Sequence, residues 1–410
     1  MPIGINFVSV TLAFAARVIM ARVLGPASFG TFAVWQNNIQ LFGTLGTVGK
    51  INHVIRETSR IEDPRSQLAM GVASIAVMLT VTGALFFGAG GAIIFLTMQD
   101  GQPNSAWLQF AATPLFALLT VLSAIHRGLG SLVFGVIFDR LISQILFLAF
   151  LLAAFGAWRA ELLATMTVFT LTLAVAAVAS LFYLIKNTGV EALKLKKGVN
   201  LLQDWRNVLP FFLVNALFVI NARYLLSYAG IFVDGDVLGQ VGLIFTVVAM
   251  MVIPISSLEL VAAPYLATKM QEEGARRAII NYLAVITAIV AAGLIVISLA
   301  YPLIFELAAI ERTISLHLVL LLSAAFGFSL IANGGLSVLQ FAGREHAAAK
   351  LLGIATTAKL IVGYLVGKMY GLVTLFGVDL AITIVFATAV ISKALTVRRR
   401  PEAGDRQSTS

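Results

Sequence analysis

Residues 17–30 read RVIMARVLGPASFG, an arginine inside an apolar run that ends in a Gly-Pro turn, with another apolar run directly after it. Residues 223–242 return to this pattern about 200 residues later as RYLLSYAGIFVDGDVLGQVG. There too the arginine lies midway along an apolar segment that ends in a glycine-containing turn. The repeated pattern predicts one hairpin that is used twice. An arginine in hydrocarbon costs about 2.5 kcal/mol or more, so the two arginines are expected to share a buried role.

The composition is that of an integral membrane protein. Hydrophobic residues make up 60% of the 410 residues and charged residues only 11%, with a mean hydropathy of +0.97. This leaves too little polar surface to cover a soluble globule. Cysteine is absent, which excludes disulfides and thiolate metal sites, and the four histidines are scattered singly. We therefore expect no metal and no cofactor.

Apolar runs near the 20 residues that span a bilayer occur twelve times. The first six cover about residues 3–23, 29–49, 68–97, 106–125, 133–156 and 162–186, and the second six cover about residues 208–231, 237–266, 278–303, 314–340, 350–368 and 372–395. We predict an all-α protein with two six-helix bundles at 1–186 and 208–396, joined by a cytoplasmic amphipathic linker at 187–207 and followed by a disordered cytoplasmic tail at 397–410.

The lysines and arginines indicate the orientation of these spans. Of the 28 basic residues, 21 flank the spans on one side, four lie on the other side, and Arg17, Arg223 and Lys359 lie within spans. Basic flanks are retained in the cytoplasm, so both termini are expected there and the turns after Arg17 and Arg223 are expected outside. This placement in short loops argues against a nucleic-acid partner.

The two halves are expected to have the same orientation. Spans one and seven both run from inside to outside, so a pseudo-twofold axis along the membrane normal relates the bundles. Duplicated transporters of this kind bind their substrate in the cleft between the halves. The sequence lacks a P-loop and any paired-carboxylate or nucleophile constellation. We therefore expect a transporter and no enzyme, with no catalytic residues.

Several stretches carry a family resemblance. ARVLGPASFGTFA from residue 21, KINHVIRE from residue 50, LPFFLVNA from residue 209, NARYLLS from residue 221 and APYLATKM from residue 263 together resemble bacterial polysaccharide flippases. These are the Wzx-like exporters of lipid-linked oligosaccharides, of the O-antigen flippase type, in the MOP (multidrug/oligosaccharidyl-lipid/polysaccharide) superfamily. The likeness covers nearly the whole chain, and the LGPxxFG turn is its most specific part.

The resemblance implies a MATE/MOP-like fold in the bacterial inner membrane. It also implies transport of an undecaprenyl-diphosphate-linked oligosaccharide from the cytoplasmic to the periplasmic leaflet, for the assembly of O-antigen (lipopolysaccharide), capsule or exopolysaccharide. Membrane lipids, and polysaccharide polymerase or chain-length machinery, would then be the other partners.

Three intramembrane cations form the candidate substrate site. Arg17 lies about 10 Å below the external end of its span, and Arg223 lies at a comparable depth. Guanidinium forks suit phosphate oxygens, although each could instead satisfy groups in its own half. Lys359 is placed near the midplane, where Asp379 on the next span reaches a similar depth. An ion pair with Asp379 and contact with substrate are both open for Lys359.

Polar and helix-breaking residues complete the candidate site. Asn37 and Gln40 are three positions apart on one helix face, where they could bond sugar hydroxyls or neighbouring helices. Pro254 lies inside the eighth run and removes a backbone hydrogen bond, so a kink is expected there, and with it a place for a gate.

Three alternatives stay open. A MATE-type multidrug or cation antiporter has the same design, but is expected to carry carboxylates where spans one and seven here carry arginine. A membrane-embedded polysaccharide polymerase or ligase is expected to have a long external loop, which this sequence lacks. A peptidoglycan-precursor flippase of the same superfamily typically has two more spans than this chain.

Overall fold

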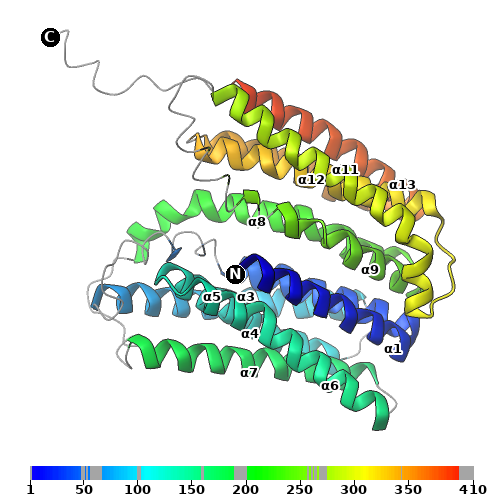
Figure 1. Ribbon diagram of the computed structural model, residues 1–410, viewed down its shortest axis with the longest axis horizontal. Helices are drawn as coiled ribbons and strands as arrows, with labels where there is room; N and C mark the ends of the chain where they lie inside the picture. The colour runs from blue at the N-terminus through cyan, green and yellow to red at the C-terminus, as the bar shows by residue number, and fades with distance from the viewer. Residues whose placement is uncertain are drawn as a thin grey trace.

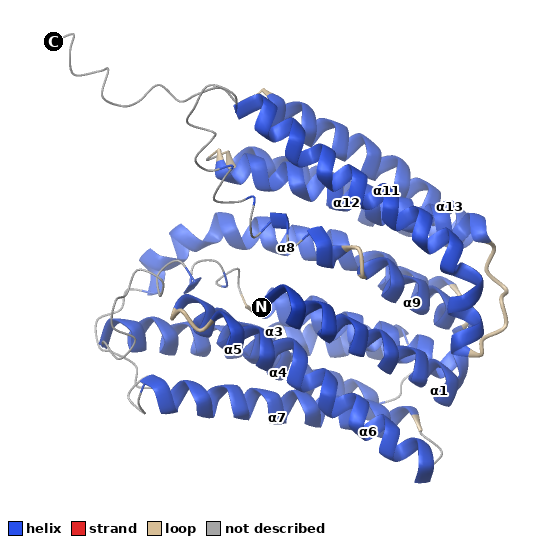
Figure 2. Cartoon of the chain, in the orientation of Figure 1, coloured by secondary structure: helices blue, strands red, loops and turns tan. Residues whose placement is uncertain are grey.

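The chain is helical in the computed structural model, with no strand among the residues that the structure describes (Figure 2). These residues are 2–47, 67–98, 103–157, 161–188, 201–255, 275–342 and 344–396, together with the single positions 51, 54, 55, 258, 259, 262 and 266. Positions 189–200 of the expected linker and the expected tail, 397–410, lie outside the described residues.

The N-terminal half contains six spans. Its elements are α1 (Pro2–Gly46), α3 (Gln67–Met98), α4 (Pro103–Gly128), α5 (Leu132–Val136), the π-helix η1 (Ile137–Ile142), α6 (Ser143–Ala157) and α7 (Leu162–Thr188). The short α5, η1 and α6 follow one another without a gap and make a single span. The long α1 makes two spans, because it reverses direction.

The C-terminal half also contains six spans. Its elements are α8 (Leu201–Phe232), α9 (Gly235–Ala249), α11 (Ala275–Ala308), α12 (Leu316–Phe341) and α13 (Glu345–Leu395). The start of α8 lies seven residues earlier than the expected span, so residues 201–207, expected in the linker, are helical. Ten described helices are long and apolar enough to cross a membrane. Since α1 and α13 each cross twice, the twelve predicted spans are accounted for.

Gly25 is the point at which α1 reverses. Its φ of 74° and ψ of 166° belong to a region that glycine alone occupies readily, and Pro26 then starts the second arm. Arg17 and Gln36 are 19 residues apart yet share a hydrogen bond of 3.0 Å. In a continuous helix they would be about 28 Å apart. The two arms therefore fold back on each other, as the Gly-Pro turn predicted.

Gly371 is the point at which α13 reverses. Its φ is 77° and its ψ is −167°. Lys359 and Asp379 lie on opposite sides of this glycine and form an ion pair of 2.9 Å, although a continuous helix would separate them by about 30 Å. The last two predicted spans are thus a hairpin, with their boundary at the glycine.

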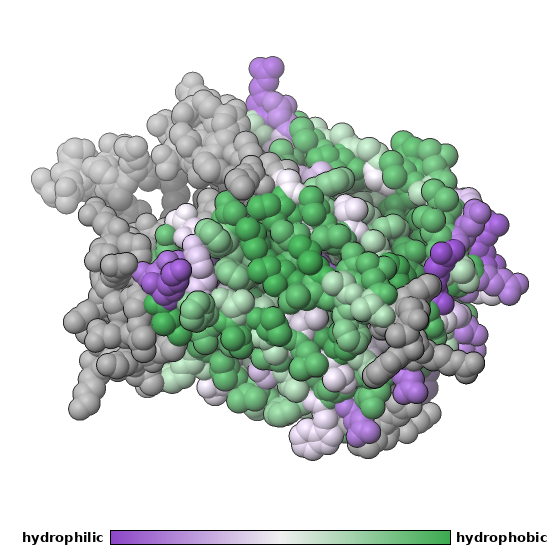
Figure 3. All heavy atoms as spheres, turned by 60° about the horizontal axis from the view of Figure 1, so that its bottom comes forward, coloured by the Kyte–Doolittle hydropathy of each residue, from purple (hydrophilic) through white to green (hydrophobic). Residues whose placement is uncertain are grey.

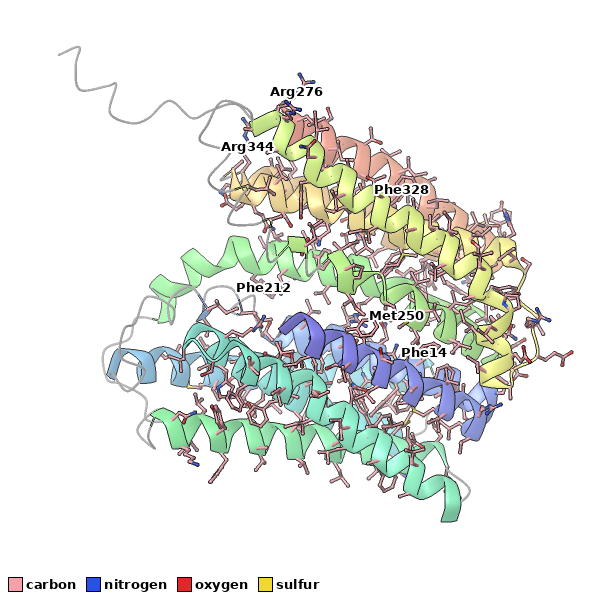
Figure 4. All side chains as sticks on the ribbon, viewed as in Figure 1. Phe14, Phe212, Met250, Arg276, Phe328 and Arg344 are labelled. Carbon is pink, nitrogen blue, oxygen red and sulfur yellow. The ribbon has the colours of Figure 1, made fainter. Side chains whose placement is uncertain are left out.

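The two halves form two bundles that meet along α1, α8 and α9. In Figure 1, α3 to α7 occupy the lower part of the view and α11 to α13 the upper part, with α8 passing between them. Contacts between α1 and both α8 and α9 join the bundles. Figure 4 places Arg276 and Arg344, both expected to be cytoplasmic, at one end of the upper bundle.

The outer surface is apolar where a soluble protein would be polar. Figure 3 shows a broad hydrophobic band on the visible face, with hydrophilic side chains gathered mainly toward its ends. Phe86, Leu299 and Val385 are 76%, 77% and 70% exposed. Such an apolar surface is what lipid tails solvate, so this is an all-α integral membrane protein.

Aromatic packing fixes the second arm of α1 inside the N-terminal bundle. Phe32 stacks on Phe147 with 6.1 Å between ring centroids, and Trp35 meets Phe169 edge-on at 5.8 Å. The indole of Trp35 also donates a hydrogen bond of 3.2 Å to the carbonyl of Ser105. These contacts hold the polar face of the same arm toward the other bundle.

Candidate functional site

One cavity of about 460 Å³ brings most of the predicted site residues together. It lies where α1 faces α8, α9, α12 and α13. Six of the seven predicted residues line it, namely Arg17, Asn37, Gln40, Arg223, Lys359 and Asp379. Pro254 is not among the lining residues, although Val252 and Ile255 on either side of it are.

Arg17 reaches across the interface between the halves. Its Nη1 donates to the hydroxyl of Thr246 on α9 at 2.8 Å, and its Nη2 donates to Oε1 of Gln36 at 3.0 Å. Both partners are neutral. The charge of Arg17 is therefore held in place without being neutralised.

Arg223 is held in a similar way from the other half. Its Nη1 donates to Oδ1 of Asn37 at 3.4 Å, and the side-chain amide of Asn37 donates to the Arg223 carbonyl at 3.0 Å. Arg17 and Arg223 line the same cavity, and the residues that hold them, Gln36 and Asn37, are neighbours on α1. Among the described residues, no carboxylate pairs with either guanidinium. Within the part of the chain that the structure describes, the shared cavity thus contains two fixed positive charges with no carboxylate bonded to them.

Lys359 differs from the two arginines because its charge is compensated. Its ammonium forms the 2.9 Å ion pair with Asp379 and donates to Oδ1 of Asn221 at 2.8 Å. The Tyr224 hydroxyl donates a hydrogen bond to the same oxygen of Asp379. Lys359 and Asp379 are only 1% and 4% exposed. Of the two open interpretations of Lys359, the ion pair is the one present in this state.

Asn37 and Gln40 diverge in their contacts. The Asn37 amide bonds across the interface to Ser227 at 3.1 Å, in addition to Arg223, and Ser227 donates to Asn38 at 3.0 Å. Asn37 thus bonds a neighbouring helix. Gln40, one turn further along, lines the cavity.

Pro254 follows a break in its helix. Regular helix ends at Ala249 and resumes at Val252, and the Ile253 amide bonds to the carbonyl of Met250 at 3.2 Å. A proline at 254 cannot donate to that carbonyl, so the turn tightens in front of it. A break in the regular helix therefore lies directly before the proline, where the kink was expected.

A glycine-lined seam closes the cavity toward the Gly25 turn. Gly242 and Ala33 line the cavity, and a Cβ on Gly242 would lie 2.8 Å from that of Ala33. One turn further on, a Cβ on Gly239 would lie 2.1 Å from the Pro26 oxygen, and one on Gly30 would lie 2.6 Å from the Gly239 nitrogen. At this end, α1 and α9 are therefore in direct backbone contact.

Several residues of the site were missed by the sequence analysis. In a hairpin that reverses at Gly25, residues at equal distances before and after the turn lie opposite each other. Gln36 lies within one helical turn of the position opposite Arg17, so this pairing could have identified it. Thr246, Asn221 and Tyr224 have no comparable signal, because their roles depend on how separate helices pack. The described residues contain no group of three or more His, Asp or Glu that could hold a metal ion.

Two six-helix bundles around a charged cavity define a membrane transporter fold. Neither a family model nor a curated protein matches this sequence. Solved structures match over nearly its whole length. The inward-facing conformation of a multidrug resistance MATE family transporter of the MOP superfamily has a TM-score of 0.71 and 16% identity, covering 97% of this chain and 96% of that one.

Two further structures show the same fold. The outward-facing conformation of a multidrug resistance MATE family transporter gives a TM-score of 0.64 at 14% identity, over 96% of this chain and 94% of that one. The lipid II flippase MurJ, in an inward closed conformation, gives a TM-score of 0.70 at 11% identity, over 96% of this chain and 87% of that one. The chain therefore has the fold of MOP-superfamily transporters.

Proposed function

We propose that this protein is a flippase that moves a lipid-linked oligosaccharide, joined to its undecaprenyl carrier by a diphosphate, from the cytoplasmic to the periplasmic leaflet. The observation that carries this proposal is the pair Arg17 and Arg223, one from each half, whose partners in one shared cavity are all neutral among the described residues. A site with uncompensated positive charge is complementary to an anion.

The chemistry of arginine narrows the class of anion. Each guanidinium presents a planar fork of donors that matches phosphate oxygens, and bonds between charged groups are about twice as strong as neutral ones. Two like-charged forks that line one cavity are both satisfied by a ligand with two adjacent negative groups. A diphosphate has this arrangement.

A multidrug or cation antiporter is the second candidate, and one observation favours it. Glu259 lines the cavity and lies 3.5 Å from the amide of Asn333, which gives a cation one carboxylate to approach. The other lining carboxylate, Asp379, is already paired with Lys359. The anion site is preferred because its two charges lack this compensation.

Transport would proceed by alternating access. The headgroup enters the cavity while the lipid tail stays in the bilayer, and the halves then separate at the Gly25 end. The direct backbone contact of α1 and α9 at the Gly25 end supports an inward-facing state. An inside-negative potential favours outward movement of an anion by about 2.3 kcal/mol per charge per 100 mV. On charge grounds, no coupling ion is required.

The expected setting is the bacterial inner membrane, with both termini cytoplasmic. The excess of basic residues on one side of the spans supports this orientation. The proposed partners are membrane lipids and the lipid-linked glycan, with contacts to polysaccharide polymerase or chain-length machinery for O-antigen, capsule or exopolysaccharide assembly.

The test is glycan export in a deletion strain complemented with variants. Arg17→Ala and Arg223→Ala should each reduce the periplasmic-leaflet level of lipid-linked glycan, by about tenfold or more if one charged contact is lost. Arg22→Ala is the matched control, because Arg22 lies five positions from Arg17 on α1 and is exposed. Unchanged export in both cavity variants, at normal expression, would rule out the proposed site.

A further inference from the structure

The cavity carries a second polar group, which the arginines do not touch. Glu259 follows α9 in the chain, and Ser329 and Asn333 lie one turn apart on α12; all three line the cavity and are half-buried. The amide nitrogen of Asn333 lies 3.5 Å from Oε1 of Glu259. A carboxylate is unexpected in a cavity that attracts an anion, so its position needs an explanation.

The hydrogen bonds supply part of the explanation. Arg17 bonds to Thr246 and Gln36, whereas Glu259 approaches the amide of Asn333. Among the described residues, Glu259 forms no ion pair with the Arg17 guanidinium. The cavity has a cationic end at α1 and α8, and an end at α12 that carries a carboxylate, an amide and a hydroxyl.

The ends differ in the chemistry they can recognise. The arginines only donate hydrogen bonds, whereas a carboxylate accepts from up to four directions, an amide both donates and accepts, and a hydroxyl does either. Phe326 and Leu330 add apolar walls beside this second group. Acceptors, donors and an apolar wall together suit a neutral ring with several hydroxyls.

We infer that Glu259, Asn333 and Ser329 form a sugar subsite, which binds the hydroxyl groups of the sugar nearest the diphosphate. This inference rests on the proposed function, because it assigns the second end of the same cavity. A volume of about 460 Å³ is within the usual range of about 300–1,000 Å³ for small-ligand sites. The cavity then holds the diphosphate and this first sugar, while the rest of the glycan extends beyond it.

The subsite makes the protein selective for a sugar and not only for phosphate. Sites built to bond a hydroxyl reject analogues that lack it, because their polar groups are left unpaired.

The test uses the full chain in detergent and two probes in isothermal titration calorimetry. One probe is farnesyl diphosphate, and the other is the same molecule with one N-acetylglucosamine on its terminal phosphate.

The expected result is tighter binding of the sugar-bearing probe, by about tenfold or more. Asn333→Ala and Glu259→Gln should each reduce the ratio of the two affinities, by about threefold to tenfold for one lost hydrogen bond. Asn281→Ala is the matched control, because Asn281 is exposed on α11 and its loss should keep the ratio. The variant Arg17→Ala should weaken both probes together and also keep the ratio.

Other outcomes separate this inference from the proposed function. Equal affinity of the wild type for both probes, or an unchanged ratio in Asn333→Ala, would overturn the sugar subsite alone. Unchanged binding of both probes by Arg17→Ala would overturn the anion site. Binding of tetraphenylphosphonium that disappears in Glu259→Gln would make Glu259 a cation site and would also overturn the subsite.

Discussion

Arg17 and Thr246, 229 residues apart in the chain, share a hydrogen bond of 2.8 Å that ties the N-terminal half to the C-terminal half. The Thr246 hydroxyl itself donates to the carbonyl of Gly242 at 2.9 Å, which leaves its lone pairs to accept from the guanidinium. A ligand anion that draws on Arg17 competes with Thr246. The bond thus connects an occupied cavity to the contact between the halves.

Replacing Thr246 with valine should loosen this contact. A hydrogen bond to a charged group contributes about 1.5–3 kcal/mol, so Thr246→Val should raise the fraction of molecules whose halves are separated at this end. Because the chain has no cysteine, spin labels can be placed at two introduced cysteines, one in each half, and the distribution of the distance between them can be measured. Thr246→Ser keeps the hydroxyl and should resemble the wild type, and an unchanged distribution in the valine variant would contradict the prediction.

The pair Lys359 and Asp379 should behave as a buried ion pair. Removing one partner leaves an uncompensated charge and costs about 3–5 kcal/mol, whereas replacing both with apolar residues is often neutral. Lys359→Met should therefore lower the thermal unfolding temperature in detergent, and the double variant Lys359→Met/Asp379→Leu should recover it. A single variant as stable as the wild type would contradict this view.

The double variant also reports on transport. If Lys359 changes partner from Asp379 to the substrate during the transport cycle, the double variant should lose export although its stability is recovered. If the pair serves only the fold, export should persist. The two interpretations that the sequence left open are thereby separated.

The spans and their hairpins could be predicted from the sequence because they depend on local physics. Apolar run length sets a span, and Gly25 and Gly371 set a reversal through a backbone conformation that other residues rarely adopt. Comparable depth on antiparallel spans also placed Lys359 beside Asp379. The same reasoning located Arg17 within its span.

The cavity could be predicted only in part, because its contacts join helices that are far apart in the sequence. The bonds from Arg17 to Thr246 and from Lys359 to Asn221 depend on the positions of α8 and α9 against other helices. Glu259 is a further residue of this kind, which the structure places on the cavity wall. The break at Met250 in front of Pro254 is part of what shapes that wall.

Gly25 should be intolerant of any side chain for conformational reasons alone. A Cβ added there would meet nothing within 4 Å, so space is not limiting, but its φ of 74° is strained for other residues. Gly25→Ala should lower the free energy of unfolding by about 1–3 kcal/mol, measured by thermal unfolding in detergent. Gly4→Ala, on the same helix and also in open space, should be neutral or slightly stabilising. Equal stability of the two variants would disprove the strain.

Gly239 should control whether the cavity can close at the Gly25 end. A Cβ at this position would lie 2.1 Å from the Pro26 carbonyl oxygen, and backbone cannot yield as a flexible side chain can. In Gly239→Val, α1 and α9 must therefore move apart, and the population should shift toward the state that is open at this end. Spin labels at Arg22→Cys and Asp236→Cys, both exposed positions beside the seam, should show a longer distance. Gly90→Ala, where a Cβ meets nothing, should keep the wild-type distance, and a folded Gly239→Val protein that also kept it would show that the seam is not the gate.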